Sequence, residues 1–384
     1  MSQITKNTLR NKVVSVLEKQ GYSINNNIFV LKDDSRETKR EAHSIAKAER
    51  ICKNEQFVLR NIHLIKKYLI DGKNLNINKI EPEIIEVQRG TKYEIIFRWW
   101  NLVWWSLPYE RAYGRQIRFI IWDKYHNAPI GLIGLQSPIL SWSVRDNYIG
   151  LKKEERDYWV NQSMSAQRLG ALPPYNYILG GKLVASLLTA NQIRETFKKK
   201  YQKKKTIIKK RKLPPRLLFV TTTGAYGKSS IYNRLKFFKE PISEFIGYTH
   251  GNGTFHIPNK LYEDFIGYLS KRNYNVSRGY GNGPSRKLRI INHAMECLGI
   301  SNGTNHGIKR AVYIFSLAKN LKQVIKNNEN PEWINRNVID ITNFWRQRWA
   351  IPRVKNRKEY MSFSGGYFIE QTIEEMKRYK KLQG

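Results

Sequence analysis

The feature that most constrains this chain is its charge. Its 384 residues contain 68 Lys and Arg but only 31 Asp and Glu, which gives a formal net charge of +37. On one compact body such an excess destabilises the folded state through self-repulsion, so we expect a polyanion to supply the counter-charge. Nucleic acid is the polyanion we favour. An anionic membrane surface is disfavoured, because the sequence shows no basic amphipathic helix with a clean apolar face.

The rest of the composition is typical of a globular protein. Hydrophobic residues make up 41% of the chain, which is enough for a sizeable core. The sequence has neither an apolar run of membrane-spanning length nor a signal-peptide pattern at its start, so we expect a cytoplasmic protein with no membrane partner. With only Cys52 and Cys297, a disulfide framework and a cysteine-rich zinc module are excluded, and no metal site is predicted.

Hydrophobic periodicity divides the chain into three regions. Residues 1–90 are predicted to be helical, with a long second helix over about 34–70, and residues 321–384 are predicted to form a basic helical tail. Residues 91–320 are predicted to form a mixed core with a hairpin over 116–136, a strand over 165–172, a helix over 179–189, a strand over 216–222, a helix over 229–238 and a hairpin over 249–254. The expected fold class is therefore α/β in the broad α+β sense, a mixed sheet with helical regions at both ends.

The most basic segment is the loop over residues 198–216, which has eleven basic residues and no acidic one. Such a run attracts phosphates through charge alone, whereas the alternative is a solvated loop with no partner of its own. We predict phosphate contacts by the basic side chains of this loop and by four others in the core: Lys198, Lys199, Lys200, Lys203, Lys204, Lys205, Lys209, Lys210, Arg211 and Lys212, with Lys228, Arg234, Arg286 and Arg310.

Tryptophan is concentrated in one part of the chain, where seven of the ten Trp residues lie between positions 99 and 159. The pairs Trp99–Trp100 and Trp104–Trp105 stand close together near basic residues. Aromatic rings beside cations can stack nucleic-acid bases. Large apolar side chains more often fill a core, so we favour a core role for these residues.

Two segments are predicted to lead from a strand into a helix, a geometry that can seat an anion. In residues 221–230, Gly227 and Lys228 resemble a phosphate loop. The spacing Gly-x-x-Gly-Lys-Ser is two residues shorter than that of nucleoside triphosphatases, so hydrolysis of a nucleoside triphosphate is disfavoured. The second segment, residues 173–182, has two possible interpretations: a site that seats an anion, or glycines that allow a helix to pack tightly.

Carboxylates argue against one large class of nucleic-acid enzymes. A two-metal nuclease or a DDE-type transposase needs several convergent carboxylates to hold its cations. Between residues 165 and 262 the chain offers only Glu195, Glu240 and Glu244. We therefore disfavour nuclease chemistry.

Taken together, the motifs resemble the DruA family of the Druantia anti-phage defence systems. The stretches that carry the resemblance are YGRQIRF at 113–119, RDNYIG at 145–150, LGALPPYN at 169–176, LGGKLVA at 179–185, TTTGAYGKSSIYNR at 221–234, IGYTHG at 246–251, GNGP at 281–284 and HGIKR at 306–310. The resemblance implies a role in blocking phage and a helicase-like protein as a partner. It implies no particular reaction.

The predicted order of elements is also similar to that of GNAT-type acetyltransferases. In that fold the first glycine-rich helix start receives the pyrophosphate of an acyl-CoA. The resemblance places an acyl-CoA-like cofactor at Tyr177, Gly180, Gly181 and Lys182. It also assigns Tyr232 to the tyrosine that protonates the departing thiolate. The family pattern Arg/Gln-x-x-Gly-x-Gly/Ala is Tyr-x-x-Gly-x-Lys here.

Three hypotheses follow from the sequence. The first is a component that binds nucleic acid, DNA rather than RNA, for partner enzymes of a defence system. The second is a group transferase that modifies nucleic acid, with a pocket of polar and titratable side chains: Ser229, Ser230, Tyr232, His250 and His256. The third is a basic scaffold for other defence proteins.

Overall fold

The computed structural model describes residues 5–383 except 106, 108–113, 207–208 and 278–284. Its centre is a seven-stranded sheet of order β10-β11-β7-β6-β5-β4-β3, in which β6 and β7 are parallel and all other neighbours antiparallel. The α+β fold class is confirmed. The strands are β3 (Pro82–Glu86), β4 (Gln116–Asp123), β5 (Ala128–Gln136), β6 (Ser163–Ala171), β7 (Phe219–Thr223), β10 (Glu244–Tyr248) and β11 (Ala311–Ser316).

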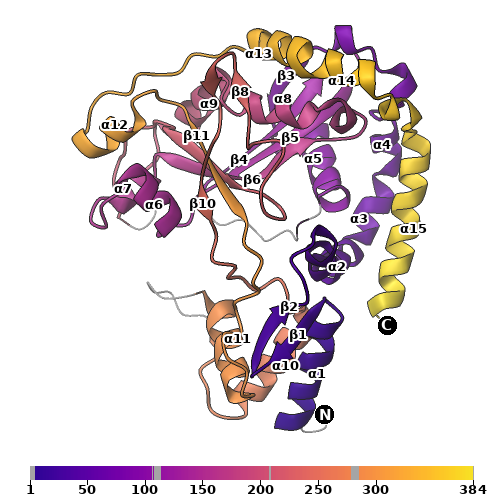
Figure 1. Ribbon diagram of the computed structural model, residues 1–384, viewed down its shortest axis with the longest axis vertical. Coiled ribbons are helices and arrows are strands. Elements are labelled where there is room, and N and C mark those ends of the chain that lie inside the picture. The colour runs from indigo at the N-terminus through magenta and orange to yellow at the C-terminus, as the bar shows by residue number, and fades with distance from the viewer. Residues whose placement is uncertain (1–4, 106, 108–113, 207–208, 278–284, 384) are drawn as a thin grey trace.

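One face of the sheet is covered by α8 (Gly180–Leu187) and α13 (Val338–Trp345) (Figure 1). Alternation along β4 places Ile117, Phe119 and Ile121 on this face, where they pack in one core with the buried residues of α8. The predicted hairpin over 116–136 is confirmed as β4–β5. The strand over 165–172 and the helix over 179–189 are confirmed as β6 and α8.

The opposite face packs against α5 (Lys92–Val103) and the helices around it. Trp99 and Trp100 are fully buried there, so the core role predicted for this pair is confirmed. The helix predicted over 34–70 is interrupted, since α2 (Arg36–Lys53), α3 (Glu55–Arg60) and α4 (Ile62–Lys66) are separate pieces. The C-terminal α15 (Gly365–Gln383) packs against α2 and α4.

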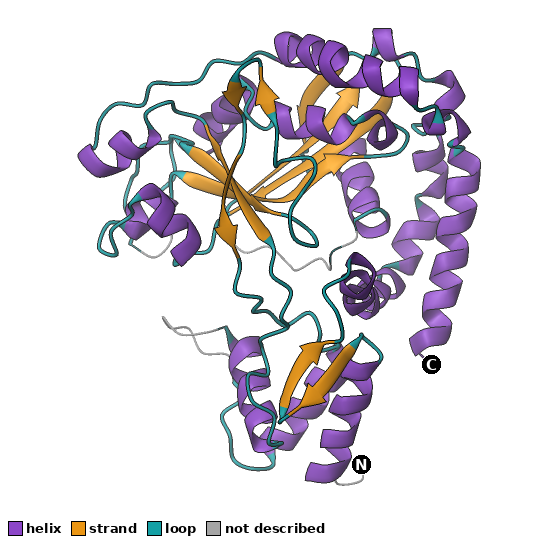
Figure 2. Cartoon of the chain, in the orientation of Figure 1, coloured by secondary structure: helices purple, strands orange, loops and turns teal. Residues whose placement is uncertain are grey.

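A smaller lobe, the lower lobe, lies below the sheet in Figure 2 and has its own hydrophobic core. It combines the start of the chain with a segment inserted between β10 and β11. Its elements are α1 (Lys6–Glu18), β1 (Tyr22–Asn25), β2 (Ile28–Leu31), α10 (Asn259–Ser270) and α11 (Arg286–Cys297). The core of this lobe joins α1 to α10 and α11 across the predicted division at residue 90, and Ala42 of α2 also belongs to it.

Two local predictions are wrong. Residues 229–238 form turns and a short strand instead of a helix, since residues 236–237 pair with residues 240–241 as antiparallel strands. Residues 249–254 form no hairpin, since β10 pairs with the distant β11 and Asn252 makes an isolated bridge to Asn305.

The remaining elements are helices, short strands and 3₁₀ turns. They are α6 (Ser143–Ile149), α7 (Arg156–Val160), α9 (Asn191–Tyr201), α12 (Leu321–Asn327), a π-helix (Arg346–Ala350), α14 (Ile351–Asn356), the short strands β8 (Lys236–Phe237) and β9 (Glu240–Pro241), and the 3₁₀ turns Gly72–Asn74, Ile77–Lys79, Tyr175–Ile178 and Glu359–Ser362. Within the described ranges, none of the helices has the length and apolar character needed to cross a membrane.

Candidate functional site

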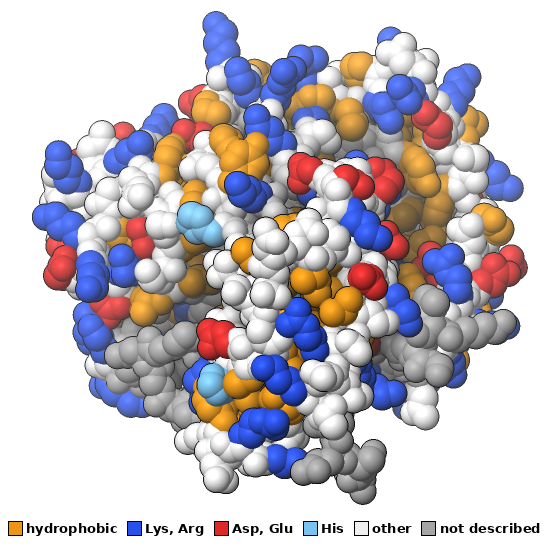
Figure 3. All heavy atoms as spheres, turned by 60° about the horizontal axis from the view of Figure 1, so that its bottom comes forward, with side chains coloured by type: hydrophobic (Ala, Val, Ile, Leu, Met, Phe, Trp, Pro, Cys, Tyr) orange, Lys and Arg blue, Asp and Glu red, His pale blue; other side chains and the backbone are white. Residues whose placement is uncertain are grey.

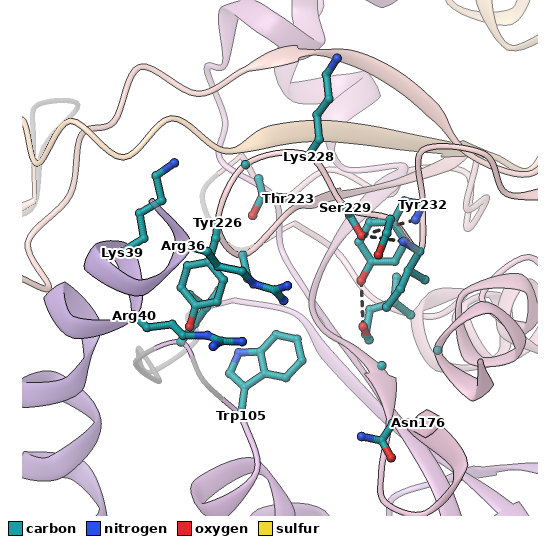
Figure 4. A pocket seen from close by; sticks show the side chains of 18 of the residues that line it. Arg36, Lys39, Arg40, Trp105, Asn176, Thr223, Tyr226, Lys228, Ser229 and Tyr232 are labelled. Carbon is teal, nitrogen blue, oxygen red and sulfur yellow. Dashed lines mark hydrogen bonds between the residues drawn. The ribbon is translucent and has the colours of Figure 1, made fainter. Parts of the chain in front are cut away.

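A cavity of about 1320 Å³ lies at the ends of the parallel strands β6 and β7. Helix α2 forms one wall with the side chains of its first turns, and the turn that follows β7 forms the opposite wall (Figure 4). The end of α5 supplies Trp104 and Trp105, and the start of α8 closes the remaining side. The cavity therefore collects residues from parts of the chain that are distant in sequence.

The lining is strongly basic. Among the lining residues that the structure describes, six are Lys or Arg and Asp34 is the one carboxylate: the basic residues are Arg36, Lys39, Arg40, Lys182, Lys228 and Lys309. Figure 3 shows the same bias on a wider scale, because blue side chains outnumber red ones across the face it presents. This charge distribution favours an anionic occupant.

Two arginines of α2 dominate the cavity wall. The guanidinium groups of Arg36 and Arg40 point into the cavity and flank the ring of Tyr226 (Figure 4). Their Cζ atoms lie 5.8 and 5.9 Å from the centre of that ring, within cation–π range. Among the described residues neither arginine forms an ion pair, so both guanidinium groups are available to an anion.

Two lysines of the lining have a different role. Lys39 is buried and its Nζ lies 2.6 Å from a carboxylate oxygen of Asp34, so its charge is already neutralised. Lys228 is exposed, with its Nζ 5.6 Å from the ring of Phe245. In Figure 4 both side chains point away from the ring of Trp105. The ring of Trp105 has another cation beside it, since Cζ of Arg168 lies 6.0 Å from the ring centre.

The aromatic part of the lining is held in place by packing on β6. A Cβ atom on Gly170 would lie 2.9 Å from the ring of Trp104, so the absence of a side chain at this position lets that ring rest on the strand. The rings of Trp104 and Trp105 contact each other with centres 5.1 Å apart. Trp105 is half-buried, and it lines the cavity below the two arginines (Figure 4). A partly exposed indole beside cations suits the stacking of a base.

The structure brings only part of the predicted catalytic set together. Ser229, Ser230 and Tyr232 line the cavity, whereas His250 and His256 are absent from its described lining. The hydroxyl of Tyr232 is buried and donates a hydrogen bond to the carbonyl oxygen of Leu169 at 2.8 Å. Burial raises the pKa of this hydroxyl. In this geometry Tyr232 supports the wall of the cavity, and its role as an acid remains a prediction.

Each of the two histidines has its own surroundings. His250 is exposed, with its Nε2 3.5 Å from the hydroxyl of Ser143. His256 is fully buried in the lower lobe, where Nε2 donates to the carbonyl oxygen of Gly303 at 2.9 Å. Burial lowers the pKa of His256 to about 4, so this ring is neutral at neutral pH. These contacts are typical of a hydrogen-bonding role within the fold.

The start of α8 does not fit the pyrophosphate of an acyl-CoA. A Cβ on Gly180 would lie 2.6 Å from the carbonyl oxygen of Tyr175, and one on Gly181 would lie 2.8 Å from Cδ1 of Ile231. Both glycines therefore serve close packing, and the space beside them is filled by protein. Lys182 follows them, and burial lowers the pKa of its amine, with a further contribution from the charge of Arg348. Tyr177 is absent from the described lining, so the four residues predicted for a cofactor form no open cradle.

The basic loop over 198–216 lies at the other end of the parallel strands, where it leads from α9 into the start of β7. Part of its charge is neutralised within the fold. Lys200 lies 2.5 Å from a carboxylate oxygen of Glu86, Lys209 lies 2.9 Å from one of Asp157, and Arg211 also contacts Asp157. The other predicted cations of the loop are exposed: Lys198, Lys199, Lys203, Lys204, Lys205, Lys210 and Lys212.

The four predicted cations outside the loop are dispersed. Lys228 lines the cavity and Arg234 is exposed. Arg286 donates to the carbonyl oxygen of Val276 at 2.7 Å, and Arg310 contacts Nε2 of His43 at 2.7 Å. The phosphate contacts predicted for these residues remain predictions.

Sequence reasoning missed the most prominent cations of the cavity. Arg36 and Arg40 are one helical turn apart, so a search for paired arginines near a helix start could have found them. No sequence pattern near Tyr226 or Trp105 indicates that these side chains lie close to the two arginines. The three segments are distant in sequence and come together only when the sheet is formed.

Comparison with known proteins places this site in context. The family described as "Druantia protein DruA" matches residues 33–327, a range that contains every described lining residue of the cavity. The protein "Druantia protein DruA" of Escherichia coli (strain UMEA 4076-1) is 36% identical over 326 residues, which cover 84% of this chain and 80% of that protein. No solved structure matches the chain. Of the stretches that carried the resemblance, residue 113 and residues 281–284 lie outside the described residues.

Proposed function

This chain belongs to the DruA family, and we propose that it acts in anti-phage defence by binding nucleic acid, with DNA as the first substrate to test. The observation that supports this function is the pair of arginine side chains beside an accessible indole. Arg36 and Arg40 point into the cavity without a carboxylate partner among the described residues, and Trp105 lies below them.

The chemistry of these groups suits a nucleotide. A guanidinium group presents parallel N–H donors that match the oxygens of a phosphate, so two arginines can hold the backbone. An indole can stack on any base, since every base has a π face. Together they favour binding without strong sequence preference, and an unpaired base is needed to reach Trp105.

A partner can supply such unpaired bases. The DruA resemblance implies a helicase-like protein in the same defence system. Because a helicase separates strands, we propose that its single-stranded product is what this cavity receives.

The test removes the two arginines and measures binding across a salt series. Fluorescence anisotropy with single-stranded DNA, duplex DNA and RNA of equal length gives the affinity of the unchanged protein and of the R36A/R40A variant. Loss of two phosphate contacts should reduce the slope of log affinity against log salt by about 1.4 for a single strand and about 1.8 for a duplex. A K66A/K67A variant is the matched control, because both lysines are exposed at the end of α4 and are absent from the described lining of the cavity.

The outcomes separate the alternatives. If the arginine variant keeps the slope of the unchanged protein while binding persists, the nucleic acid binds elsewhere and the cavity assignment fails. If the unchanged protein binds none of the three nucleic acids, the proposed function itself fails, and a scaffold role for the basic surface becomes the better hypothesis.

A group transferase that modifies nucleic acid is the second candidate. The observation that favours it is the position of the cavity, which lies at the ends of two parallel strands. The buried hydroxyl of Tyr232 argues against the acid predicted for that chemistry. Binding is therefore the function that the geometry supports best.

A further inference from the structure

A second basic hollow adjoins the cavity. It measures about 330 Å³ and lies along α14 and the π-helix that precedes it, and Leu179 lines both the hollow and the cavity. Three of its seven described lining residues are arginines and none is acidic: Leu179, Arg348, Trp349, Pro352, Arg353, Asn356 and Arg357. We call these residues the arginine groove. The shared leucine places the groove next to the cavity.

The groove is a built feature of the fold. Figure 1 shows α13 and α14 running beside α8, and two hydrogen bonds hold them there. The indole of Trp345 donates to the carbonyl oxygen of Leu179 at 3.0 Å, and Nε of Arg353 donates to that of Tyr177 at 3.1 Å. Between α13 and α14 the chain makes a single π turn, Arg346–Ala350, which carries Arg348 and Trp349. Single π turns are rare in proteins, and those that occur often lie at functional sites.

Lys182 connects the two hollows. It lines the cavity, and its Nζ lies 5.3 Å from the ring of Trp349 in the groove. Burial lowers the pKa of this amine and the charge of Arg348 lowers it further, as expected of two neighbouring cations. An anion between them would relieve their mutual repulsion.

We propose that the arginine groove continues the path of a nucleic-acid strand whose end or unpaired nucleotide occupies the cavity. This inference rests on the proposed function. The strand passes Lys182, places its phosphates on Arg348 and Arg357, and can stack a base on Trp349. The occupant is a single strand, because a paired base cannot reach either indole. The groove should therefore raise the affinity for longer strands over shorter ones, whatever their sequence.

The test uses the full chain and two lengths of single-stranded DNA. Arg348 and Arg357 are replaced by Ala, while Arg353 is kept because it holds the turn at Tyr177. Each phosphate contact to a single strand contributes a slope of about 0.7, which is about fivefold in affinity at 0.1 M salt relative to 1 M. R348A/R357A should therefore bind an oligonucleotide of about 12 nucleotides about 25-fold more weakly at 0.1 M salt. Its affinity for an oligonucleotide of about 3 nucleotides, measured by competition, should equal that of the unchanged protein.

Two controls keep the result interpretable. R348K/R357K retains both charges and should restore most of the affinity for the longer strand. K66A/K67A removes the same charge outside the groove and should leave the ratio of the two affinities unchanged. Circular dichroism and thermal unfolding of each variant show whether it is folded.

Each outcome has one reading. If the unchanged protein binds both lengths equally, or if R348A/R357A loses affinity for both by the same factor, the groove is not part of the path and the proposal is overturned, while the function proposed for the cavity stands. If no length binds, the proposed function has failed. If the variant binds every length normally but phage protection is lost, the groove docks a partner protein, and the strand path is refuted.

Discussion

Three buried histidines should make the folded protein sensitive to mild acid. His43, His256 and His306 lie where α2 and the lower lobe meet, and His43 stacks on Phe255 with ring centres 4.0 Å apart. Burial lowers the pKa of these rings to about 3, about 4 and about 2, respectively, and the nearby charge of Arg310 contributes for His43 and His306. All three are neutral in the folded state at pH 5, whereas in the unfolded chain they titrate near pH 6.5.

The direction and size of the effect follow from proton binding. Below about pH 6.5 the unfolded chain binds protons that the folded protein does not, so stability is complete above this pH and is lost as the pH falls. Between pH 7 and pH 5 each such histidine removes about 2 kcal/mol, whatever its folded pKa below 5. Three independent groups would remove about 6 kcal/mol, which is comparable to the total stability of many domains.

Urea unfolding at pH 7, 6 and 5 and constant ionic strength measures this loss. The free energy of unfolding should fall steeply over this range. H43Q should reduce the pH dependence by about one third, since it removes one of three titrating groups. H63A is the matched histidine control, because His63 is exposed on α4. A free energy of unfolding that stays constant from pH 7 to pH 5 would refute the argument.

Two further predictions follow from the packing around the cavity. Y232F removes the buried hydrogen bond to the carbonyl oxygen of Leu169 and should destabilise the protein by about 1 kcal/mol, while phage protection survives; protection lost with nucleic-acid binding intact would favour transferase chemistry instead. G131A would place a Cβ 2.6 Å from the carbonyl oxygen of Gly170 and should lower stability by about 1–3 kcal/mol in thermal unfolding. G267A in α10 meets no atom within 4 Å and should raise stability by up to about 1 kcal/mol, so equal effects of the two substitutions would contradict this account.

The proposed function depends on a cavity that is formed by distant segments of the chain, and not on a single sequence motif. The basic loop over 198–216 was the clearest signal of charge in the sequence, yet three of its cations pair with Glu86 and Asp157. Both arginines among the described lining residues of the cavity instead come from α2, whose sequence is mixed in charge. Charge can be counted along a chain, but whether a cation is available to a ligand depends on which carboxylates the fold places beside it.

The sequence by itself determined the class of the protein and its local elements. The alternating pattern of residues 117–121 identified β4, the break at residues 173–174 separated β6 from α8, and the quoted stretches identified the family. These features are local, because the side-chain periodicity of a strand or helix is set by backbone geometry within a few residues. The core role of Trp99 and Trp100 followed from size and apolarity alone.

Only the tertiary structure decided how distant segments pair. The pairing of β10 with β11 and the joining of α1 to α10 and α11 connect residues that are far apart in the chain, and no local pattern specifies which partner a buried face will choose. The cavity depends on the same long-range choices, since Arg40, Trp105 and Tyr226 become neighbours only after the sheet has brought α2, α5 and the turn after β7 together. Local periodicity shows which face of a helix or strand is buried. The packing of the whole core determines which other element that face contacts.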